Sequence, residues 1–282
     1  MDSLEDFECY DRLLIKPFNK SGWNVEEISW RKKNVNWNDY DAVIVRSTWD
    51  YQSDYKKFLE ALKNIENSSA VLFNDYKTLI WNMNKTYLRD LQEKGINVVT
   101  TIWEEKFKIE SLKNYFKYFN TEEIIIKPTI SANADNTFLL NRNSFTDYRE
   151  VLSNTFSNLN FMVQPFLKNI ISEGEYSLFY FNGVHSHTIL KTPKENDFRV
   201  QEEHGGTIKA VKTDKIKKNI AEEIIHKLSP VPLYARIDLV RTDNENFALM
   251  ELELIEPSLY FQLDKDSTKR FVNAFIEKMN ES

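Results

Sequence analysis

The chain has 282 residues, of which 41% are hydrophobic and 28% charged, and its formal net charge is −6. This length suffices for one large domain or two to three smaller lobes, and the acidic balance argues against a nucleic-acid partner. The single cysteine, Cys9, excludes an intramolecular disulfide and cysteine-based metal clusters. No apolar run reaches membrane-spanning length and the acidic start 1–6 lacks signal-peptide features, so we expect a cytoplasmic protein without a membrane partner.

The first part of the chain predicts an α/β arrangement. A strand at 38–46, a helix at 51–64, a short strand at 70–73 and a helix at 85–94 follow one another. The loop after the first strand lies where open α/β sheets bind ligands. We therefore predict substrate contacts from Arg46, Ser47, Thr48, Trp49, Asp50 and Tyr51. Arg46 suits a carboxylate and the aromatic residues suit packing, although Trp49 could equally seal an interface between lobes.

Beyond residue 122 the chain is dominated by strands. We predict them at 123–127, 161–164, 176–181 and 184–191, with helices at 214–228 and from about residue 268. The turn Asn182-Gly183 separates two of the strands. No long low-complexity linker is present, so the lobes should abut one another.

The segments 232–241 and 247–258 predict an acidic β-hairpin, joined by the polar turn 242–246. Strand alternation places Arg236 with Asp238 on one face, and Glu251 with Glu253 on one face. The opposite sides are apolar, with Leu233, Ala235, Ile237 and Leu239 on the first strand and Met250, Leu252 and Leu254 on the second. Three carboxylates this close favour Mg²⁺ or Mn²⁺, with phosphates completing the coordination. The alternative is a solvated hairpin face.

Several motifs follow one another in a set order. They are Trp81-Asn-Met-Asn-Lys85, Ile124-Ile-Ile-Lys-Pro128, Phe161-Met-Val-Gln-Pro-Phe-Leu167, Glu173-Gly-Glu-Tyr-Ser177, Arg236-x-Asp238 and Glu251-x-Glu253. Together they resemble the ATP-grasp superfamily, in particular its glutathione-synthetase-like branch. The motif Arg46-Ser-Thr-Trp-Asp-Tyr51 resembles that of a bacterial group within this branch, a group that includes D-cycloserine ligase. The resemblance covers nearly the whole chain.

The resemblance implies an ATP-grasp fold that combines α/β and α+β parts. A small α/β pre-ATP-grasp domain at 1–80 would precede a central lobe at 81–163 and a C-terminal lobe at 164–282 with the metal-binding hairpin. The implied enzyme is an ADP-forming ligase that joins a small amino-acid-like carboxylate to an amine through an acyl phosphate. Relatives are often dimers or tetramers, which makes a homo-oligomer an open expectation.

The resemblance also assigns roles to individual residues. Lys85 and Lys127 would reach the ATP phosphates, Gln164, Pro165, Phe166 and Leu167 would form the adenine hinge, and Glu175 would hold the ribose. Asp238, Glu251 and Glu253 would bind two Mg²⁺ ions, while Arg236, Lys191 and Arg199 would be catalytic. By sequence alone, Lys85 could be a solvated helix lysine, Gln164 to Leu167 a core strand, Glu175 a surface turn residue and Arg236 a salt bridge across the hairpin.

The sequence departs from the family pattern at two places. The phosphate-covering loop 129–137 contains no glycine, although many relatives have glycines there. The chain also starts where relatives have completed their first strand, so we expect either that the N-terminal sheet lacks its leading strand or that the start is internal. The missing glycines support an alternative function, a nucleotide-binding protein without ligase activity. The three carboxylates and Arg236 argue against that alternative. His185 and His187 share one strand face without a third ligand, so we interpret them as packing or substrate-side residues.

Overall fold

The structure is a computed structural model that describes residues 1–5, 7–242 and 244–281. Asp6 of the acidic start, Asp243 of the predicted hairpin turn and the terminal Ser282 lie outside the described residues. The α-helices are α1 (Ile15–Lys20), α2 (Tyr55–Glu66), α3 (Tyr76–Met83), α4 (Tyr87–Glu93), α5 (Leu112–Phe119), α6 (Arg149–Thr155), α7 (Asn169–Ser172), α8 (Lys215–His226) and α9 (Ser267–Glu281). The strands are β1 (Ala42–Ile44), β2 (Val71–Phe73), β3 (Ile102–Glu104), β4 (Glu123–Pro128), β5 (Phe138–Asn141), β6 (Phe161–Pro165), β7 (Glu175–Phe181), β8 (Val184–Thr192), β9 (Thr207–Ala210), β10 (Tyr234–Arg241) and β11 (Phe247–Glu253).

The N-terminal part contains the predicted βα unit. β1 and β2 pair in parallel and form a two-stranded sheet among the described residues. α2 buries Phe58, Leu62 and Ile65, which recur at helical spacing on one side. The sequence did not predict α3, which begins after Asp75; the Asp75 carboxylate accepts hydrogen bonds from the backbone of Lys77 and Thr78.

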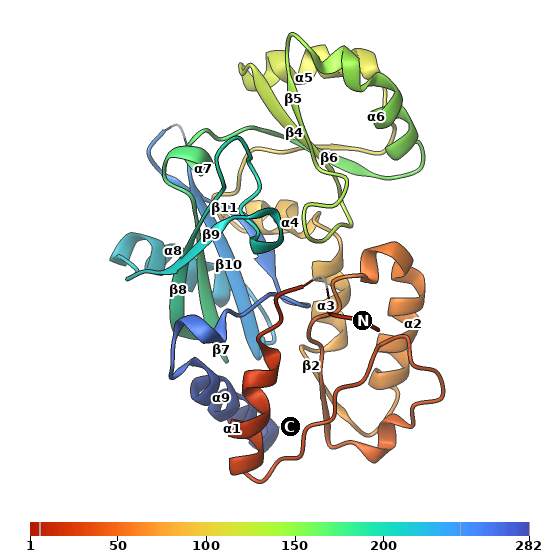
Figure 1. The fold of residues 1–282 in the computed structure, drawn as a ribbon, viewed down its shortest axis with the longest axis vertical. Helices are drawn as coiled ribbons and strands as arrows, with labels where there is room; N and C mark the ends of the chain where they lie inside the picture. The colour runs from red at the N-terminus through yellow and green to blue at the C-terminus, as the bar shows by residue number, and fades with distance from the viewer. Residues whose placement is uncertain (6, 243, 282) are drawn as a thin grey trace.

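The central lobe is an antiparallel sheet in the order β3-β6-β4-β5, packed with α5 and α6 (Figure 1). Its core consists only of residues between 102 and 163, among them Phe116, Ile126 and Phe161. β4 alternates between buried and half-buried residues, as expected for a strand with one face on this core. The predicted boundary between residues 163 and 164 falls inside β6. The strands at 123–127 and 161–164 were predicted, whereas β3, β5, α5 and α6 were not.

The C-terminal sheet has the order β11-β10-β7-β8-β9 and apolar clusters on both faces. One cluster includes side chains of α4 and α8, such as Leu88 and Ile224. The other includes side chains of α1 and α9, such as Phe18 and Phe271, so the first and last α-helices share a core (Figure 1). The helix that carries Tyr87 and Leu88 therefore packs on this sheet, although the sequence assigned it to the central lobe.

The hairpin β10–β11 has the predicted register through its charged half. Arg236 is opposite Glu253 and Asp238 is opposite Glu251. A β-bulge follows, because Asp238 pairs with Glu251 while the next residue, Leu239, pairs with Leu249. Met250 is the extra residue, and it lines the same cavity as Glu251. The prediction that Met250 lies on the apolar side is therefore wrong, since strict alternation fails at the bulge.

Candidate functional site

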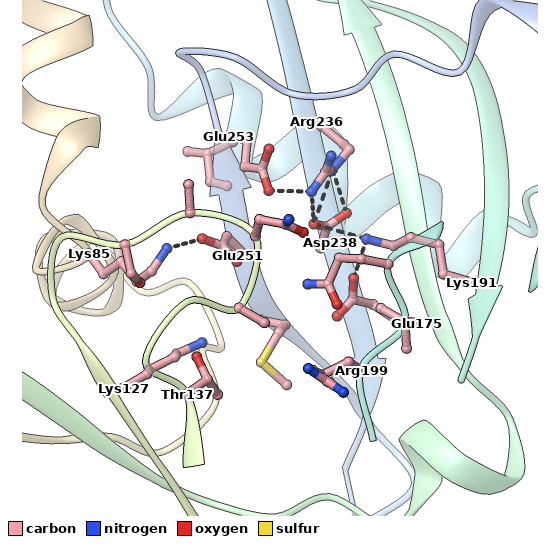
Figure 2. A pocket seen from close by; sticks show the side chains of 18 of the residues that line it. Lys85, Lys127, Thr137, Glu175, Lys191, Arg199, Arg236, Asp238, Glu251 and Glu253 are labelled. Atoms are coloured by element: carbon pink, nitrogen blue, oxygen red, sulfur yellow. Dashed lines mark hydrogen bonds and ion pairs between the residues drawn. The ribbon is translucent and has the colours of Figure 1, made fainter. Parts of the chain in front are cut away.

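A cavity of about 190 Å³ lies where the central lobe, the C-terminal sheet and the loop after β1 meet. Most of the predicted site residues line this cavity (Figure 2). These are Trp49, Tyr51, Lys85, Lys127, Gln164, Pro165, Phe166, Leu167, Glu175, Lys191, Arg199, Arg236, Asp238, Glu251 and Glu253. Arg46, Ser47, Thr48 and Asp50 are not among the lining residues.

The hairpin carboxylates face basic side chains across the cavity. Lys85 forms an ion pair with Glu251, and Arg236 forms one with Glu253 (Figure 2). Burial alone lowers the pKa of Lys85, but the Glu251 carboxylate raises it above its ordinary value. Lys85 is only 8% exposed. The alternative of a solvated lysine is therefore wrong, whereas the salt bridge across the hairpin proposed for Arg236 is present.

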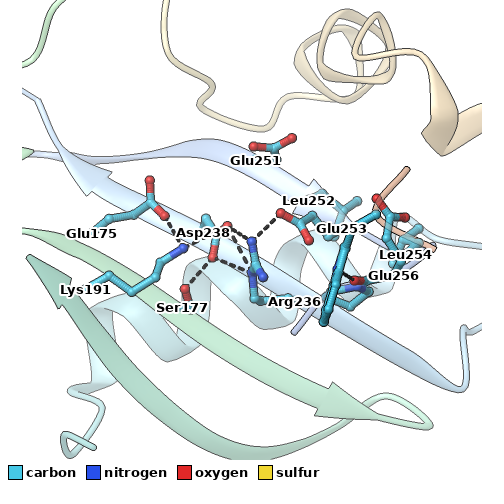
Figure 3. A network of polar contacts seen from close by, with 12 residues as sticks. Glu175, Ser177, Lys191, Arg236, Asp238, Glu251, Leu252, Glu253, Leu254 and Glu256 are labelled. Atoms are coloured by element: carbon cyan, nitrogen blue, oxygen red, sulfur yellow. Dashed lines mark hydrogen bonds and ion pairs between the residues drawn. The ribbon is translucent and has the colours of Figure 1, made fainter. Parts of the chain in front are cut away.

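Asp238 is the most enclosed of the three carboxylates, with its side chain 2% exposed. It accepts a hydrogen bond from Ser177 Oγ at 2.5 Å and one from Arg236 Nη2 at 3.0 Å, and Lys191 Nζ lies 3.4 Å away (Figure 3). Burial raises the pKa of Asp238, but Arg236 and Lys191 lower it below its ordinary value overall. Asp238 is thus held as an anion at the base of the site.

Glu251 and Glu253 are the more accessible carboxylates, since about a quarter of each side chain is exposed. Burial raises the pKa of Glu253 to about 7, although Arg236 acts in the opposite direction. The all-oxygen donor set and its common face fit Mg²⁺ in chemical type. Within the described ranges, however, no three acidic, histidine or cysteine residues are grouped closely enough to hold one ion. The ion pairs with Lys85 and Arg236 each engage one oxygen, Oε1, of Glu251 and of Glu253, and so compete with a metal ion for these carboxylates.

Lys127 differs from the other basic residues of the cavity. It lies in β4, where the strand alternation turns it out of the core that contains Ile124 and Ile126. No hydrogen bond or ion pair joins its Nζ to any part of the chain that the structure describes, and burial lowers the pKa of Lys127. The cavity therefore contains an ammonium group without a carboxylate partner, which favours an anionic ligand.

Glu175 and Lys191 form a second charged group on β7 and β8. Their side-chain atoms Oε1 and Nζ are 2.5 Å apart, and both residues are buried. The alternative that Glu175 is a surface turn residue is therefore wrong. Arg199 also lines the cavity, but it forms an ion pair with Asp197 at 2.9 Å and remains partly exposed.

The segment after β6 lines the cavity with apolar side chains. Phe166 and Leu167 are buried there, close to Ile170 and Met250 of the same wall. Gln164 points its amide toward Thr101 and donates to its Oγ1 at 3.0 Å. Apolar side chains beside the end of β6 suit an aromatic base, and they also satisfy the simpler interpretation of a core strand.

The glycine-free loop 129–137 adopts left-handed backbone conformations at three positions. They are Asn133, Ala134 and Asn136, with φ angles of 49°, 56° and 51°. Asparagine tolerates this region better than most residues, because its short polar side chain can bond locally. The loop therefore bends over the cavity without glycine, and Ser131, Asn133 and Thr137 line it.

The motif 46–51 divides between two tasks. Arg46 forms an ion pair with Asp11 at 2.9 Å and donates to the carbonyl of Pro257 at 2.5 Å, and with Ser47 it lines a separate cavity. Asp50 accepts from Trp30 and Arg31, both at 2.8 Å. Thr48 is buried. Only Trp49 and Tyr51 reach the main cavity, so the prediction that all six residues contact substrate is not supported by the ligand-free geometry.

The sequence analysis missed two charged residues of the cavity, the exposed Glu203 and the buried Glu256. Glu256 is the one that the fold encloses. It lies three residues beyond Glu253, and its backbone carbonyl accepts a hydrogen bond from Trp49 Nε1 at 2.8 Å. Burial, and then the Glu253 carboxylate, raise the pKa of Glu256 well above its ordinary value. Its signal in the sequence was an acidic residue within the apolar run Leu254-Ile255-Glu256-Pro257. Ser258 and Tyr260 complete the same wall.

Two family models match the chain. One describes the prokaryotic glutathione synthetase ATP-grasp domain and matches residues 84–265, and the other describes the N-terminal domain of D-cycloserine synthetase DcsG and matches residues 1–74. The cycloserine biosynthesis protein DcsG of Streptomyces lavendulae is 24% identical over 281 residues. That match covers 94% of this chain and 92% of the relative.

Solved structures show the same fold. The crystal structure of D-cycloserine synthetase DcsG matches with a TM-score of 0.85 and 22% identity, over 94% of this chain and 93% of that chain. The ATP-grasp ligase PsnB, complexed with a phosphomimetic variant of its minimal precursor, Mg and ADP, gives a TM-score of 0.68 and 14% identity over 99% and 96%. D-alanine–D-alanine ligase from Bacillus anthracis matches with a TM-score of 0.67 and 12% identity, over 96% of this chain and 91% of that chain. Helices in the described part of this chain are too short or too polar to span a membrane.

Proposed function

The chain belongs to the ATP-grasp family of ATP-dependent carboxylate–amine ligases, and from that premise we propose how its residues bind ATP and form the new bond. The observation that carries the assignment of roles is the unpartnered ammonium group of Lys127 opposite the acidic hairpin. Lys85 lies on the other side of the cavity, bound to Glu251. Two lysines and three carboxylates in one cavity suit a polyphosphate that arrives with divalent cations.

We propose that ATP binding exchanges the partners of these charges. The ammonium groups of Lys85 and Lys127 would bind the phosphates, which frees the Glu251 oxygens. Glu251, Glu253 and Asp238 would then hold Mg²⁺, with two ions as the expected number. When bound, Mg²⁺ neutralises phosphate charge during phosphoryl transfer. Gln164 to Leu167 would receive the adenine, and Glu175 would accept hydrogen bonds from the ribose.

The proposed reaction has two steps. A substrate carboxylate oxygen attacks the γ-phosphorus of ATP, and ADP leaves, which gives an acyl phosphate. An amine then attacks the acyl carbon, and the tetrahedral intermediate collapses to an amide with release of phosphate. Arg236 pairs with Asp238 and Glu253, and in this proposal it would stabilise the negative charge that develops on the acyl oxygen. Lys191 and Arg199 would orient the transferred phosphate or the substrate carboxylate.

The substrates that we propose are small and amino-acid-like. Support comes from the relatives, whose names include a D-cycloserine synthetase and a D-alanine–D-alanine ligase. The alternative of a nucleotide-binding protein without activity rested on the missing glycines of the loop 129–137. The left-handed residues of this loop weaken that argument, because the chain bends there without glycine.

The test is ADP release from Mg-ATP by the purified protein, with pooled amino acids and small carboxylates as substrates. We expect one pool to stimulate release in the wild type and in Glu60→Gln, a control at an exposed position on α2. Asp238→Asn, which keeps the side-chain volume, should abolish stimulation. Mass spectrometry of the active pool then identifies the amide product. Binding of Mg-ATP without stimulation by any pool would favour the non-catalytic alternative, and absence of Mg-ATP binding would contradict the assignment of this cavity.

A further inference from the structure

Glu256 is the buried acid of the cavity for which the proposed reaction has no use. Glu256 is only 8% exposed. Glu175, Asp238, Glu251 and Glu253 each have a basic partner. Among the described residues, no hydrogen bond or ion pair reaches the Glu256 carboxylate. A buried carboxylate without a partner is costly, and natural proteins keep one where a ligand supplies the missing charge or donor.

The backbone around Glu256 is held by hydrogen bonds from the loop after β1 and from Tyr234 of β10. Trp49 Nε1 donates to the Glu256 carbonyl at 2.8 Å, and Arg46 donates to the next carbonyl, that of Pro257. Tyr234 Oη donates to the carbonyl of Ile255 at 2.9 Å and to that of Val45 at 2.7 Å. Residues 255–257 are thus held by their backbone, which leaves the Glu256 side chain free for another contact. Figure 3 shows Glu256 just past the end of β11, beyond Glu253.

Among the described residues, one further acceptor without a donor lines this cavity. The Oε1 atom of Gln201 is buried without a hydrogen bond, and Gln201 lines the same cavity. An amide oxygen and a carboxylate that both lack donors match a ligand group rich in N–H bonds. The phosphates of ATP cannot be that group, because they carry negative charge and no N–H donors. The basic residues Lys85 and Arg236 that act on Glu256 are already bound to Glu251 and Glu253.

We propose that Glu256 is the specificity residue for a protonated amino group of the substrate, and that Trp49 is a positioning residue that orients it. This inference rests on the proposed function, since it names the chemical class that the ligase accepts. The recognised cation is an ammonium group, carried either by the incoming amine or by the substrate that provides the carboxylate. The motif 46–51 then acts on specificity mainly through the backbone of residues 256 and 257.

The experiment compares matched pairs of small molecules that differ only in ammonium and hydroxyl. The pairs are D- and L-alanine with the two lactates, serine with glycerate, and β-alanine with 3-hydroxypropionate. Each compound is titrated into protein saturated with Mg-ADP. Dissociation constants are measured by calorimetry. In the wild type, at least one amino compound should bind about tenfold or more tightly than its hydroxy counterpart, the size of one charge-assisted hydrogen bond.

Glu256→Gln should reduce this preference to below about threefold, while Glu203→Gln, which removes an exposed carboxylate from the same cavity, should keep it. Trp49→Phe, which loses the hydrogen bond but keeps an aromatic ring, should reduce the preference partly. A preference that survives in Glu256→Gln, or no preference for ammonium in any pair with wild type, would overturn the inference. Mg-ATP affinity, measured on the same samples, should be equal in wild type and Glu256→Gln; its absence in both would instead count against the proposed function.

ADP release distinguishes the two sources of the cation. If the preferred amino compound stimulates release alone, its ammonium group belongs to the substrate that is phosphorylated. If release requires a second compound with a carboxylate, the ammonium group belongs to the incoming amine. Either result supports recognition by Glu256, provided that the stimulation depends on this residue.

Discussion

Replacement of Lys127 by methionine tests the central assignment, because no described residue forms an ion pair or hydrogen bond with its ammonium group that the substitution would break. Methionine keeps the length of the side chain and removes the ammonium group. Burial already lowers the pKa of Lys127, which means that its charge is disfavoured in the empty cavity. We therefore expect Lys127→Met to leave the free energy of unfolding unchanged or slightly increased. The same substitution should weaken Mg-ATP binding by about tenfold to a hundredfold, the equivalent of a charge-assisted hydrogen bond of about 1.5–3 kcal/mol.

Lys85→Met provides the matched comparison. Lys85 would also lose a phosphate contact, so its effect on Mg-ATP affinity should be similar. In addition, Glu251 would lose its basic partner while its side chain remains three-quarters covered. A stranded carboxylate of this kind costs about 1–3 kcal/mol, so Lys85→Met should be less stable than Lys127→Met by roughly that amount.

The assay is calorimetric titration with Mg-ATP together with urea unfolding, for the wild type and both variants. We expect weaker Mg-ATP binding in both variants and a lower free energy of unfolding in Lys85→Met alone. Unchanged affinity in Lys127→Met would refute the phosphate role of this residue. Equal destabilisation of the two variants would refute the argument from their different partners.

Two further predictions concern the scaffold around the site. Burial lowers the pKa of His187 to about 4. Between about pH 6.5 and 4 the folded state therefore binds fewer protons than the unfolded state. The free energy of unfolding should fall as the pH drops through this window, by up to about 3 kcal/mol. Urea unfolding at several pH values should show a shallower decline for His187→Gln, and an identical decline would contradict this origin. Gly174→Ala would place a Cβ atom 2.5 Å from the Lys191 carbonyl at a φ of 105°, whereas Gly95→Ala, at a φ of 92°, meets no atom within 4 Å. Both variants share the backbone strain, so any difference between them measures the clash. We expect Gly174→Ala alone to lose about 1–3 kcal/mol of further unfolding free energy, the cost of one strained contact, together with ADP release. Equal effects in the two variants would exclude the clash.

The sequence predicted the regular elements best where their pattern was strong. The strands around Lys127 and Asp238 and the helices α2, α8 and α9 alternate or repeat clearly, and the structure confirms them. The helices α3, α5 and α6 and the strands β3, β5 and β9 were missed. Most of these are short, and their stability comes from contacts with distant parts of the chain, such as the packing of Phe116 and Phe145 in the central core.

The site was predicted in its composition but not in its pairing. Alternation correctly placed Arg236 with Asp238 and Glu251 with Glu253 on one charged face. It could not reveal the bulge that turns Met250 toward the cavity, because a bulge depends on the hydrogen bonds between two strands. Nor could it show that Arg46 faces Asp11 and Pro257, since those contacts join residues far apart in the sequence. Glu256 was missed because one acid in an apolar run has no motif.

The distribution of the apolar cores has a mechanical consequence. The core shared by α1 and α9 and the core around α2 combine residues from the first and last thirds of the chain, and Asn74 adds buried hydrogen bonds to the carbonyls of Tyr234 and Leu254. The central core, in contrast, draws on residues 102–163 alone. The first and last thirds of the chain are therefore joined through shared cores, whereas the central lobe has its own core and adds Met162, Ile130 and Ala132 to the neighbouring ones. Lys127 lies in β4 of the central lobe, and Ile130 and Ala132 of the loop that follows pack against the core around α2. This loop therefore tethers the central lobe to the N-terminal part of the chain beside the cavity.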